Sequence, residues 1–244
     1  MKQLIIAFLL LGGTAMAQTF PSGKSVLDKI DQNMSARSRV ITSRMEISTT
    51  RGTRTMEMKS WSEGDEKSFT EYLSPAREKG TKMLKLDNQL WIFSPSTDRV
   101  IQISGHMLRQ SVMGSDLSYE DMMNDTPLEE QYKADVTAEE QLDGRKCWVV
   151  TLTALKEDLS YHKQQMWVDA ERFVPLKVEM FAKSGKLLKQ IEFSDVKKVQ
   201  GRWFPMTMVY TDLLKKSKGT RMQFVDIQLD VNIPAHIFNK ANLN

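Results

Sequence analysis

The residue types that most often carry out catalysis are few and scattered in this sequence. Its three histidines, His106, His162 and His236, lie far apart and do not form an H-E-x-x-H or comparable metal-binding pattern. The single cysteine, Cys147, has no C-x-x-C partner and stands beside Trp148 in an apolar run, which predicts a buried thiol rather than a nucleophile. G-x-S-x-G, P-loop and dinucleotide-binding glycine patterns are also missing from the sequence. These features predict a protein without enzymatic activity and without a cofactor.

Two further patterns contain residue types that can take part in catalysis or metal binding. The adjacent carboxylates of Glu120 and Asp121 resemble an acid pair, but neighbouring side chains on a helix point in different directions, so we expect both to be solvated. The ranges Met56–Met58 and Met206–Met208, each Met-x-Met, provide thioether ligands of the kind that bind copper. On a strand, however, each pair shares one face, as core residues do, so we predict no metal site.

Methionine is unusually frequent, with 16 residues in a chain of 244. Its unbranched thioether side chain adapts to irregular or mobile apolar partners, whereas branched side chains favour a rigid core. The set therefore fits two interpretations, a hydrophobic cavity or a solid core. The methionines concerned lie within residues 91–123 and on predicted strands: Met107, Met113, Met122 and Met123, and Met45, Met56, Met58, Met180, Met206 and Met208.

The N-terminus has the pattern of an export signal. Lys2 supplies a positive charge, Leu4–Leu11 is an apolar run too short to span a bilayer, and Ala15–Ala17 is a small-x-small cleavage pattern. We therefore predict a signal peptide over residues 1–17, cleavage near Ala17 and a periplasmic mature protein. No later stretch approaches the roughly 18 consecutive apolar residues of a spanning helix, so we expect a protein that does not span the membrane.

Opposite charges nearly balance along the chain. Lys and Arg number 34 and Asp and Glu 31, which gives a formal net charge of +3. A balance this close provides no basic field for nucleic acid, so we predict no nucleic-acid partner. With 41% hydrophobic residues, the chain is long enough to bury an ample core.

The chain after the signal peptide alternates mainly with the period of a β-strand. One helix is predicted at its start, Ser25–Met34, with Val26 and Ile30 on its apolar face and Ser25 as its cap. No crossover helix long enough for a parallel unit separates the strands. The sequence predicts one domain over residues 18–244, mainly antiparallel β with a few short helices, forming an open, incomplete β-barrel of about eleven strands.

The predicted strands are bounded by turn residues such as Asp143-Gly144. In the last of them, Val225, Ile227 and Leu229 are expected on one buried face. A hairpin precedes the others over residues 39–59, and a short helix is expected at the end of the chain. The other predicted strands include Lys67–Leu73, Thr81–Leu86, Leu90–Phe93, Lys133–Glu140, Arg145–Leu155, His162–Asp169, Val174–Ala182, Leu187–Val196, Trp203–Leu213 and Arg221–Val231.

The stretch Trp91–Met123 stands out in this β pattern. It begins with two short apolar strands around a Ser-Pro-Ser turn and continues as a methionine-rich segment with a helix candidate at Ser115–Met123. An open barrel with an apolar concave face needs a cover, and this is the main segment that can supply one. We therefore predict a helical lid, with Gly105 and Gly114 either as its hinges or as ordinary turns.

Part of this stretch resembles a family signature. Trp91–Ser96, Arg99–Val100 and Met113–Asp121 resemble the pattern W-x-Y/F-x-P…R-V-R-R-I…G-S-D-F-S-Y-E-D of the outer-membrane lipoprotein-sorting family, in its LolA-like branch. Leu117 stands where the pattern has Phe, and Ile101–Ile103 lacks the second arginine. The resemblance implies a LolA/LolB-like half-barrel that is closed by helices and binds acyl chains in its concave face.

These features together predict a periplasmic carrier that holds the acyl chains of a lipoprotein or lipid in a hydrophobic cavity and transfers them towards the outer membrane. The resemblance adds an inner-membrane transporter and an outer-membrane acceptor as partners. The alternative is a non-enzymatic accessory protein that docks a membrane transporter or a peptide through the same groove, and an enzyme acting on lipid through Glu120 and Asp121 comes third. The predicted cavity and lid residues are Met45, Met56, Met58, Trp91, Phe93, Met107, Leu108, Met113, Leu117, Tyr119, Met122 and Met123.

Overall fold

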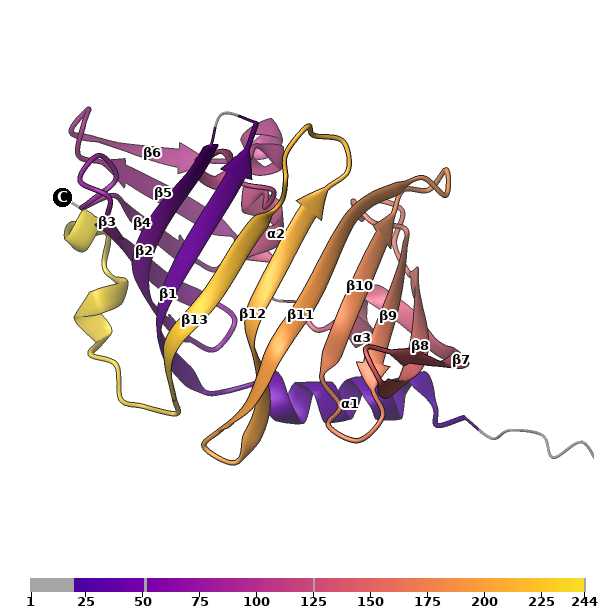
Figure 1. Cartoon of the computed structure of the whole chain (residues 1–244). Helices are drawn as coiled ribbons and strands as arrows, with labels where there is room; N and C mark the ends of the chain where they lie inside the picture. Colours follow the sequence, from indigo (N-terminus) through magenta and orange to yellow (C-terminus); the bar gives the residue numbers. More distant parts are fainter. Residues whose placement is uncertain (1–19, 51, 125, 244) are drawn as a thin grey trace, which may run out of the picture.

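The computed structural model describes residues 20–50, 52–124 and 126–243, so the signal peptide predicted for residues 1–17 lies outside the described part. Strands dominate the architecture (Figure 1). The helices are α1 (Gly23–Met34), η1 (Gly105–Arg109), η2 (Val112–Gly114), α2 (Tyr119–Met123), α3 (Leu128–Gln131), η3 (Ala235–Phe238) and η4 (Lys240–Leu243). The strands are β1 (Ser38–Thr49), β2 (Gly52–Glu63), β3 (Lys67–Ser74), β4 (Lys82–Leu86), β5 (Gln89–Ser94), β6 (Arg99–Ile103), β7 (Tyr132–Leu142), β8 (Arg145–Ala154), β9 (Lys163–Asp169), β10 (Pro175–Phe181), β11 (Leu187–Val199), β12 (Arg202–Asp212) and β13 (Thr220–Leu229).

All thirteen of these strands belong to one antiparallel sheet, in the order β6-β5-β4-β3-β2-β1-β13-β12-β11-β10-β9-β8-β7. The first and last strands of the chain, β1 and β13, pair in the middle of the sheet and join its two halves. In the described part of the chain β6 and β7 stand at opposite ends of this order, so the sheet stays open. The structure confirms the predicted open antiparallel architecture. It has thirteen strands in the described part of the chain, where about eleven were expected.

Helices cover one face of the sheet, which we call the inner face. Figure 1 shows α1 and α2 behind the same side of the sheet, α1 near one end of the strands and α2 near the other. Val26, Leu27 and Ile30 of α1 pack against inner residues of β8, β9 and β10. The segment 104–124, which contains η1, η2 and α2, covers the inner face of β1–β6 and is called the lid below. The predicted cover is thus present, although it contains shorter helices than expected.

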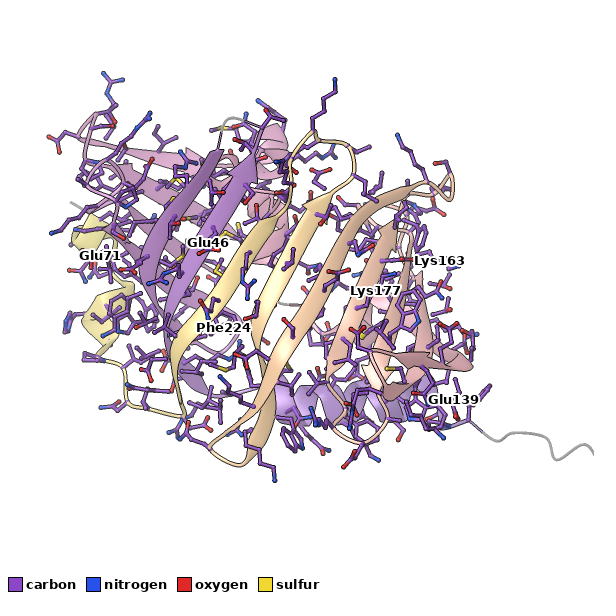
Figure 2. All side chains as sticks on the ribbon, viewed as in Figure 1. Glu46, Glu71, Glu139, Lys163, Lys177 and Phe224 are labelled. Carbon is purple, nitrogen blue, oxygen red and sulfur yellow. The ribbon has the colours of Figure 1, made fainter. Side chains whose placement is uncertain are left out.

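The opposite face of the sheet, the outer face, is partly covered by the C-terminal segment. Side chains alternate along each strand, so Glu46 stands opposite buried Met45, and Lys177 stands opposite buried Val178 (Figure 2). Phe238 and Leu243, from the short helices η3 and η4, pack on an outer cluster around Trp91. Within the described residues, no helix is long and apolar enough to cross a membrane.

The N-terminal helix α1 begins two residues earlier than predicted. Its cap is Ser22, whose Oγ accepts a hydrogen bond from the backbone N–H of Ser25 at 3.2 Å, so the prediction that Ser25 is the cap is wrong. Gly23, in the first turn, lies so close to β7 that a Cβ atom would stand 2.1 Å from the carbonyl oxygen of Ala134. Glycine is required there because the helix and the strand touch backbone to backbone.

A β-bulge changes the pattern of β13. The register between β1 and β13 shifts between Thr42 and Ser43, and Val225 is left without a partner residue. Val225 is 60% exposed, whereas Ile227 and Leu229 are buried. The prediction that Val225 shares their buried face is therefore wrong, because the extra residue of the bulge interrupts the alternation.

Candidate functional site

The methionines of the first half of the sheet form a filled core under the lid. Met45, Met56 and Met58 are almost completely buried, together with inner residues of β3, β4 and β5. The lid covers them with five partly buried apolar side chains: Met107, Leu108, Met113, Tyr119 and Met123. The structure therefore brings eight of the predicted cavity and lid residues together, but as packed neighbours.

Trp91 and Phe93 do not belong to this cluster. The strand β5 alternates, so its inner side chains are those of Leu90 and Ile92, and Trp91 and Phe93 face outwards. Trp91 packs with the C-terminal helices, and the ammonium of Lys240 stands 3.6 Å from the centre of its ring. The prediction that both aromatic residues line the inner cavity is wrong, because a shift of one residue along β5 exchanges the inner and outer side chains.

A cavity of about 330 Å3, called the slot, remains between the lid and the second half of the sheet. Its floor consists of inner side chains of neighbouring strands, among them Met180 of β10, Ile191 of β11 and Tyr210 of β12. The predicted lid residues Leu117 and Met122 line it from the lid side. The remaining lining residues are Asp121, Asn124, Leu128, Tyr161, Gln164, Lys189, Gln190 and Thr211.

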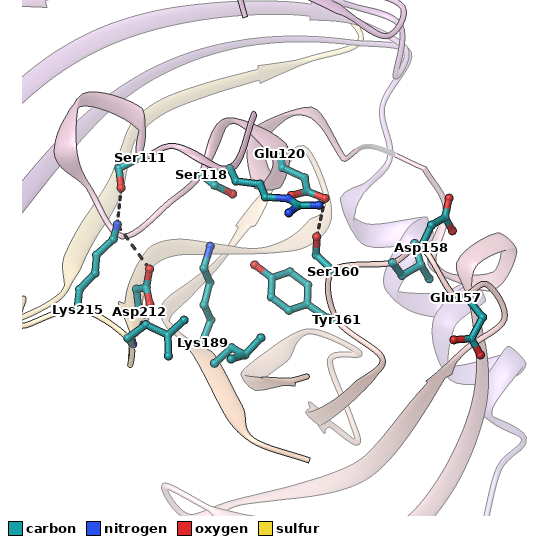
Figure 3. A pocket seen from close by; sticks show the side chains of 14 residues that line it. Ser111, Ser118, Glu120, Glu157, Asp158, Ser160, Tyr161, Lys189, Asp212 and Lys215 are labelled. Carbon is teal, nitrogen blue, oxygen red and sulfur yellow. Dashed lines mark hydrogen bonds and ion pairs between the residues drawn. The ribbon is translucent and has the colours of Figure 1, made fainter. Parts of the chain in front are cut away.

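A second cavity of about 630 Å3, called the vestibule, adjoins the slot and shares Tyr161 and Lys189 with it. Figure 3 shows polar side chains directed into it from the lid, from the β8–β9 loop and from the ends of β11 and β12. Both signs of charge are present. Its lining comprises Arg109, Lys189 and Lys215, Glu120, Glu157, Asp158 and Asp212, Ser111, Ser118, Ser160 and Tyr161, and Leu159, Leu188 and Leu214.

An ion pair between Asp121 of the lid and Lys189 of β11 lies where the two cavities meet. Both side chains are mostly buried. The hydroxyl of Tyr161 donates to the carboxylate of Asp121 at 2.7 Å, and the backbone N–H of Ser118 donates to it at 2.8 Å. Burial by itself would raise the pKa of Asp121, but the ammonium of Lys189 and the hydrogen bonds with Ser118 outweigh it and hold this pKa below its ordinary value.

The two carboxylates of the predicted acid pair have different surroundings. Glu120 accepts a hydrogen bond of 2.6 Å from the hydroxyl of Ser160 in the β8–β9 loop. Asp121 is mostly buried and paired, so the expectation that both carboxylates are solvated is wrong for Asp121. Burial, followed by the nearby carboxylate of Asp121, raises the pKa of Tyr161, so its hydroxyl remains a donor at neutral pH. These groups connect the lid to the sheet.

A second polar connection is centred on Asp116, which is 1% exposed. Its carboxylate accepts hydrogen bonds from the hydroxyl of Thr220 at 2.7 Å, from the hydroxyl of Ser217, and from the backbone N–H of Asp212 at 3.1 Å. Its own N–H donates to the Thr220 hydroxyl at 2.9 Å. The Gly-Ser-Asp part of the signature-like segment therefore fixes the lid to the β12–β13 hairpin.

Further contacts hold the lid at its middle and at its C-terminal end. The guanidinium of Arg54 donates to the carbonyl of Met113, and the ammonium of Lys85 donates to the carbonyl of Met123 at 3.1 Å. Gly105 and Gly114 both have positive φ, 55° and 76°, which are the turn conformations that glycine adopts at little cost. Their proposed role as hinges stays a prediction.

The remaining candidates for chemistry lie apart from the two cavities. Cys147 is buried among outer side chains of β8 and β9, as predicted, and burial raises its pKa to about 11. The pair Met56–Met58 belongs to the cluster under the lid, whereas Met206 packs with Phe204 elsewhere on the inner face. Among the described residues, no three His, Cys, Asp or Glu side chains gather in a group that could hold a metal ion.

Sequence reasoning missed the residues that shape the slot from the sheet side. Lys189 and Tyr161 lie on segments predicted as an ordinary strand and as a loop, and their partner Asp121 is 68 and 40 residues away in the chain. The sequence carried one signal for Lys189. This charged residue lies two positions before Ile191, so on a strand it shares the inner face with that apolar side chain.

Comparison with solved structures gives the same architecture. A domain named for outer membrane lipoprotein sorting, from Vibrio parahaemolyticus, is 24% identical, with a TM-score of 0.79 over 91% of this chain and 97% of that one. A DUF1329 family protein from Desulfovibrio piger is 25% identical, with a TM-score of 0.83 over 92% and 100%. A LolA superfamily protein from Nitrosomonas europaea is 24% identical, with a TM-score of 0.74 over 91% and 99%. No curated protein matches the sequence significantly.

An open antiparallel sheet with helices over its inner face is thus the fold of the LolA superfamily, and this chain has that fold. A family model described as "-like: Uncharacterized protein" matches residues 64–244. The chain belongs to this family.

Proposed function

We propose that this protein is a non-enzymatic carrier that holds an acyl chain of a lipoprotein or lipid in the slot. The observation that carries the proposal is the pairing of two cavities with different linings. The slot has apolar side chains such as Ile191 and Met180 on its floor, and the adjoining vestibule is lined mainly by charged and hydroxyl side chains. An amphiphile has the same two parts, an apolar chain and a polar head.

The size of the slot limits what it accepts. Its volume of about 330 Å3 is near the lower end of ligand cavities, so it suits one chain rather than several. Burial of a chain gains about 0.8 kcal/mol per methylene, which for about 16 carbons amounts to an upper bound on the order of 12 kcal/mol. Such a chain does not cross water unaided, and a carrier with an apolar slot removes that barrier.

The lid gives this carrier a means of release. It meets the second half of the sheet through the Asp121–Lys189 pair and through hydrogen bonds such as that of Glu120 with Ser160. When the lid moves, the groups in such polar contacts form hydrogen bonds with water instead. Opening an apolar contact would expose apolar surface to water, which costs more free energy. With the export signal predicted for residues 1–17, we place the protein in the periplasm, between an inner-membrane transporter as donor and an outer-membrane acceptor.

Two measurements test the proposal. Native mass spectrometry of protein purified from cells is expected to show co-purifying lipid or lipoprotein, and a fluorescent fatty acid is expected to bind. Replacement Ile191→Trp places an indole in the slot and is expected to weaken binding of the probe at least about tenfold. The matched control is Val225→Trp, because Val225 is exposed and does not line the slot.

Urea unfolding of both variants shows whether the folded state is retained. A protein that is always empty and binds no fatty-acid probe contradicts the proposal. Unchanged probe affinity in a folded Ile191→Trp protein places the chain elsewhere and contradicts the assignment of the slot.

An accessory docking protein is the second candidate, and the edge strand β6 favours it. Its Val100 and Ile101 are 42% and 48% exposed, and an exposed apolar edge can accept an added strand from a partner. A photo-crosslinker at Ile101 in cells is expected to capture one protein partner under this alternative. Capture of such a partner by a protein that carries no lipid would favour docking over transport.

A further inference from the structure

The loop between β12 and β13, residues 213–219, combines exposed leucines with lysines. Leu213 and Leu214 are 48% and 60% exposed, and Lys215, Lys216 and Lys218 follow them. Figure 1 shows this loop projecting beyond the end of the sheet opposite α1. Two adjacent leucines on a projecting loop are costly to leave in water and indicate an apolar partner.

The base of this loop is held rigidly. Lys215 donates to the carbonyl of Ser115 at 2.6 Å and pairs with Asp212 at 3.5 Å, and the hydroxyl of Ser217 donates to Asp116. The loop therefore loses little conformational freedom when a partner binds to it.

The two other lysines of the loop remain available. Lys216 and Lys218 are exposed, and neither side chain has an acceptor among the described residues. Unpaired ammonium groups beside an apolar tip match a surface that is apolar inside and negatively charged outside. That combination describes an anionic lipid bilayer.

We propose that this loop docks the protein on the surface of an anionic phospholipid bilayer. Leu213 and Leu214 enter the boundary between headgroups and acyl chains, and Lys216 and Lys218 contact lipid phosphates. Leu214 also lines the vestibule, so the docked protein presents the mouth of its cavities to the membrane. This last consequence rests on the proposed function, whereas the docking itself does not.

Co-sedimentation of the purified protein with lipid vesicles tests the docking. Binding is expected to vesicles that contain phosphatidylglycerol and to be much weaker on phosphatidylcholine alone. Replacement Leu213→Ser is expected to lower the vesicle affinity about tenfold, since the leucine side chain no longer enters the interface. The double replacement Lys216→Gln/Lys218→Gln is expected to lower it about twenty-five-fold, roughly fivefold for each charge, and to remove most of its salt dependence.

Two controls match these variants. Val225→Ser removes an exposed apolar side chain from the bulge of β13, and Lys197→Gln/Lys198→Gln removes two charges at the β11–β12 hairpin, at the other end of the sheet. Both are expected to bind vesicles like the unmodified protein. Absence of binding to any vesicle, equal binding to both lipid compositions, or loop variants that bind like the controls would each overturn the proposal.

Fatty-acid probe binding, measured on the same variants, separates docking from carriage. Leu213, Lys216 and Lys218 do not line the slot or the vestibule, so their replacement is expected to leave probe affinity unchanged. Vesicle binding without probe binding would refute the proposed carrier function and retain the docking surface. Probe binding without vesicle binding would refute the docking surface alone.

Discussion

The two halves of the inner face carry similar apolar side chains, but one half is a filled core and the other borders a cavity. Under the lid, Met45 and Met56 are sealed by apolar lid residues and leave a filled core. Over β9–β12, Met180 and Ile191 are equally apolar but border the slot. The difference is the way in which the lid meets the sheet, through apolar contact in the first half and through the Asp121–Lys189 pair in the second. Space for a ligand thus follows from polar attachment of the lid, not from methionine content.

The largest expected effect concerns the attachment itself. Replacement Asp116→Ala leaves the donors of Thr220, Ser217 and Asp212 unpaired, two of them at a buried site, and is expected to lower the free energy of unfolding by about 4 kcal/mol. Urea unfolding measures the loss. Asp226→Ala, at an exposed position of β13, is the control, with an expected change within about 0.5 kcal/mol. Similar losses in both proteins would show that the lid does not depend on Asp116.

The filled half is tested by Met56→Ala. Met56 is 0% exposed, so truncation leaves a cavity and is expected to cost about 3 kcal/mol of stability. Met180→Ala, at the slot, is expected to cost less than about 1.5 kcal/mol, because the removed atoms already border empty space. Both values come from urea unfolding. Equal losses would remove the distinction between a filled and a hollow half.

The ion pair at the hollow half is tested by Asp121→Asn. The pKa of Asp121 is lowered in the folded state, so its contribution is present above the unfolded value of about 3.9 and is lost as the pH falls through the folded pKa. The variant is expected to be about 2 kcal/mol less stable at pH 7. The difference between the two proteins should shrink below about pH 4, where the carboxyl of the unfolded chain becomes protonated while that of the folded protein is still ionised. A difference that stays constant down to pH 2 would contradict this role.

The smallest expected effect concerns the lid backbone. Gly114 has a φ of 76°, and its Cβ position is open apart from a contact of 3.7 Å with the guanidinium of Arg54. Gly114→Ala is therefore expected to cost about 1 kcal/mol through backbone strain alone. Thermal or urea unfolding measures the loss, and a stabilising effect would show that the lid adopts another conformation at this residue.

Much of the fold was predictable because alternation is a local signal. The strand Arg145–Leu155 was predicted to within one residue of β8, since a short, β-branched apolar run follows the Asp143-Gly144 turn. The bulge at Val225 was not predictable, because it arises from pairing with β1, at the other end of the chain. The face to which Trp91 points was missed for a related reason, as a shift of one residue exchanges the two faces of a strand.

The candidate site was predictable only in part. The lid segment was predicted from its composition, and eight of the twelve predicted cavity and lid residues pack together where the lid meets the sheet. The slot depends on Lys189 and Tyr161, whose proximity to Asp121 is created by the folded sheet and not by spacing along the chain. The burial of Asp116 could not be predicted either. An aspartate in a polar segment is expected to be solvated unless the groups that donate hydrogen bonds to it are known.

The polar attachment of the lid also fixes an order of events in folding. Asp116 and Thr220 are 104 residues apart in the chain, and Asp121 and Lys189 are 68 residues apart. Neither contact can form before the last third of the chain takes part in folding. The pairing of strand β1 with β13 likewise requires the C-terminal part of the chain. Contacts of this separation form slowly, and the methionine cluster around Met56 stays uncovered in the meantime. The folding chain therefore passes through an interval in which this apolar surface is exposed to water and can aggregate.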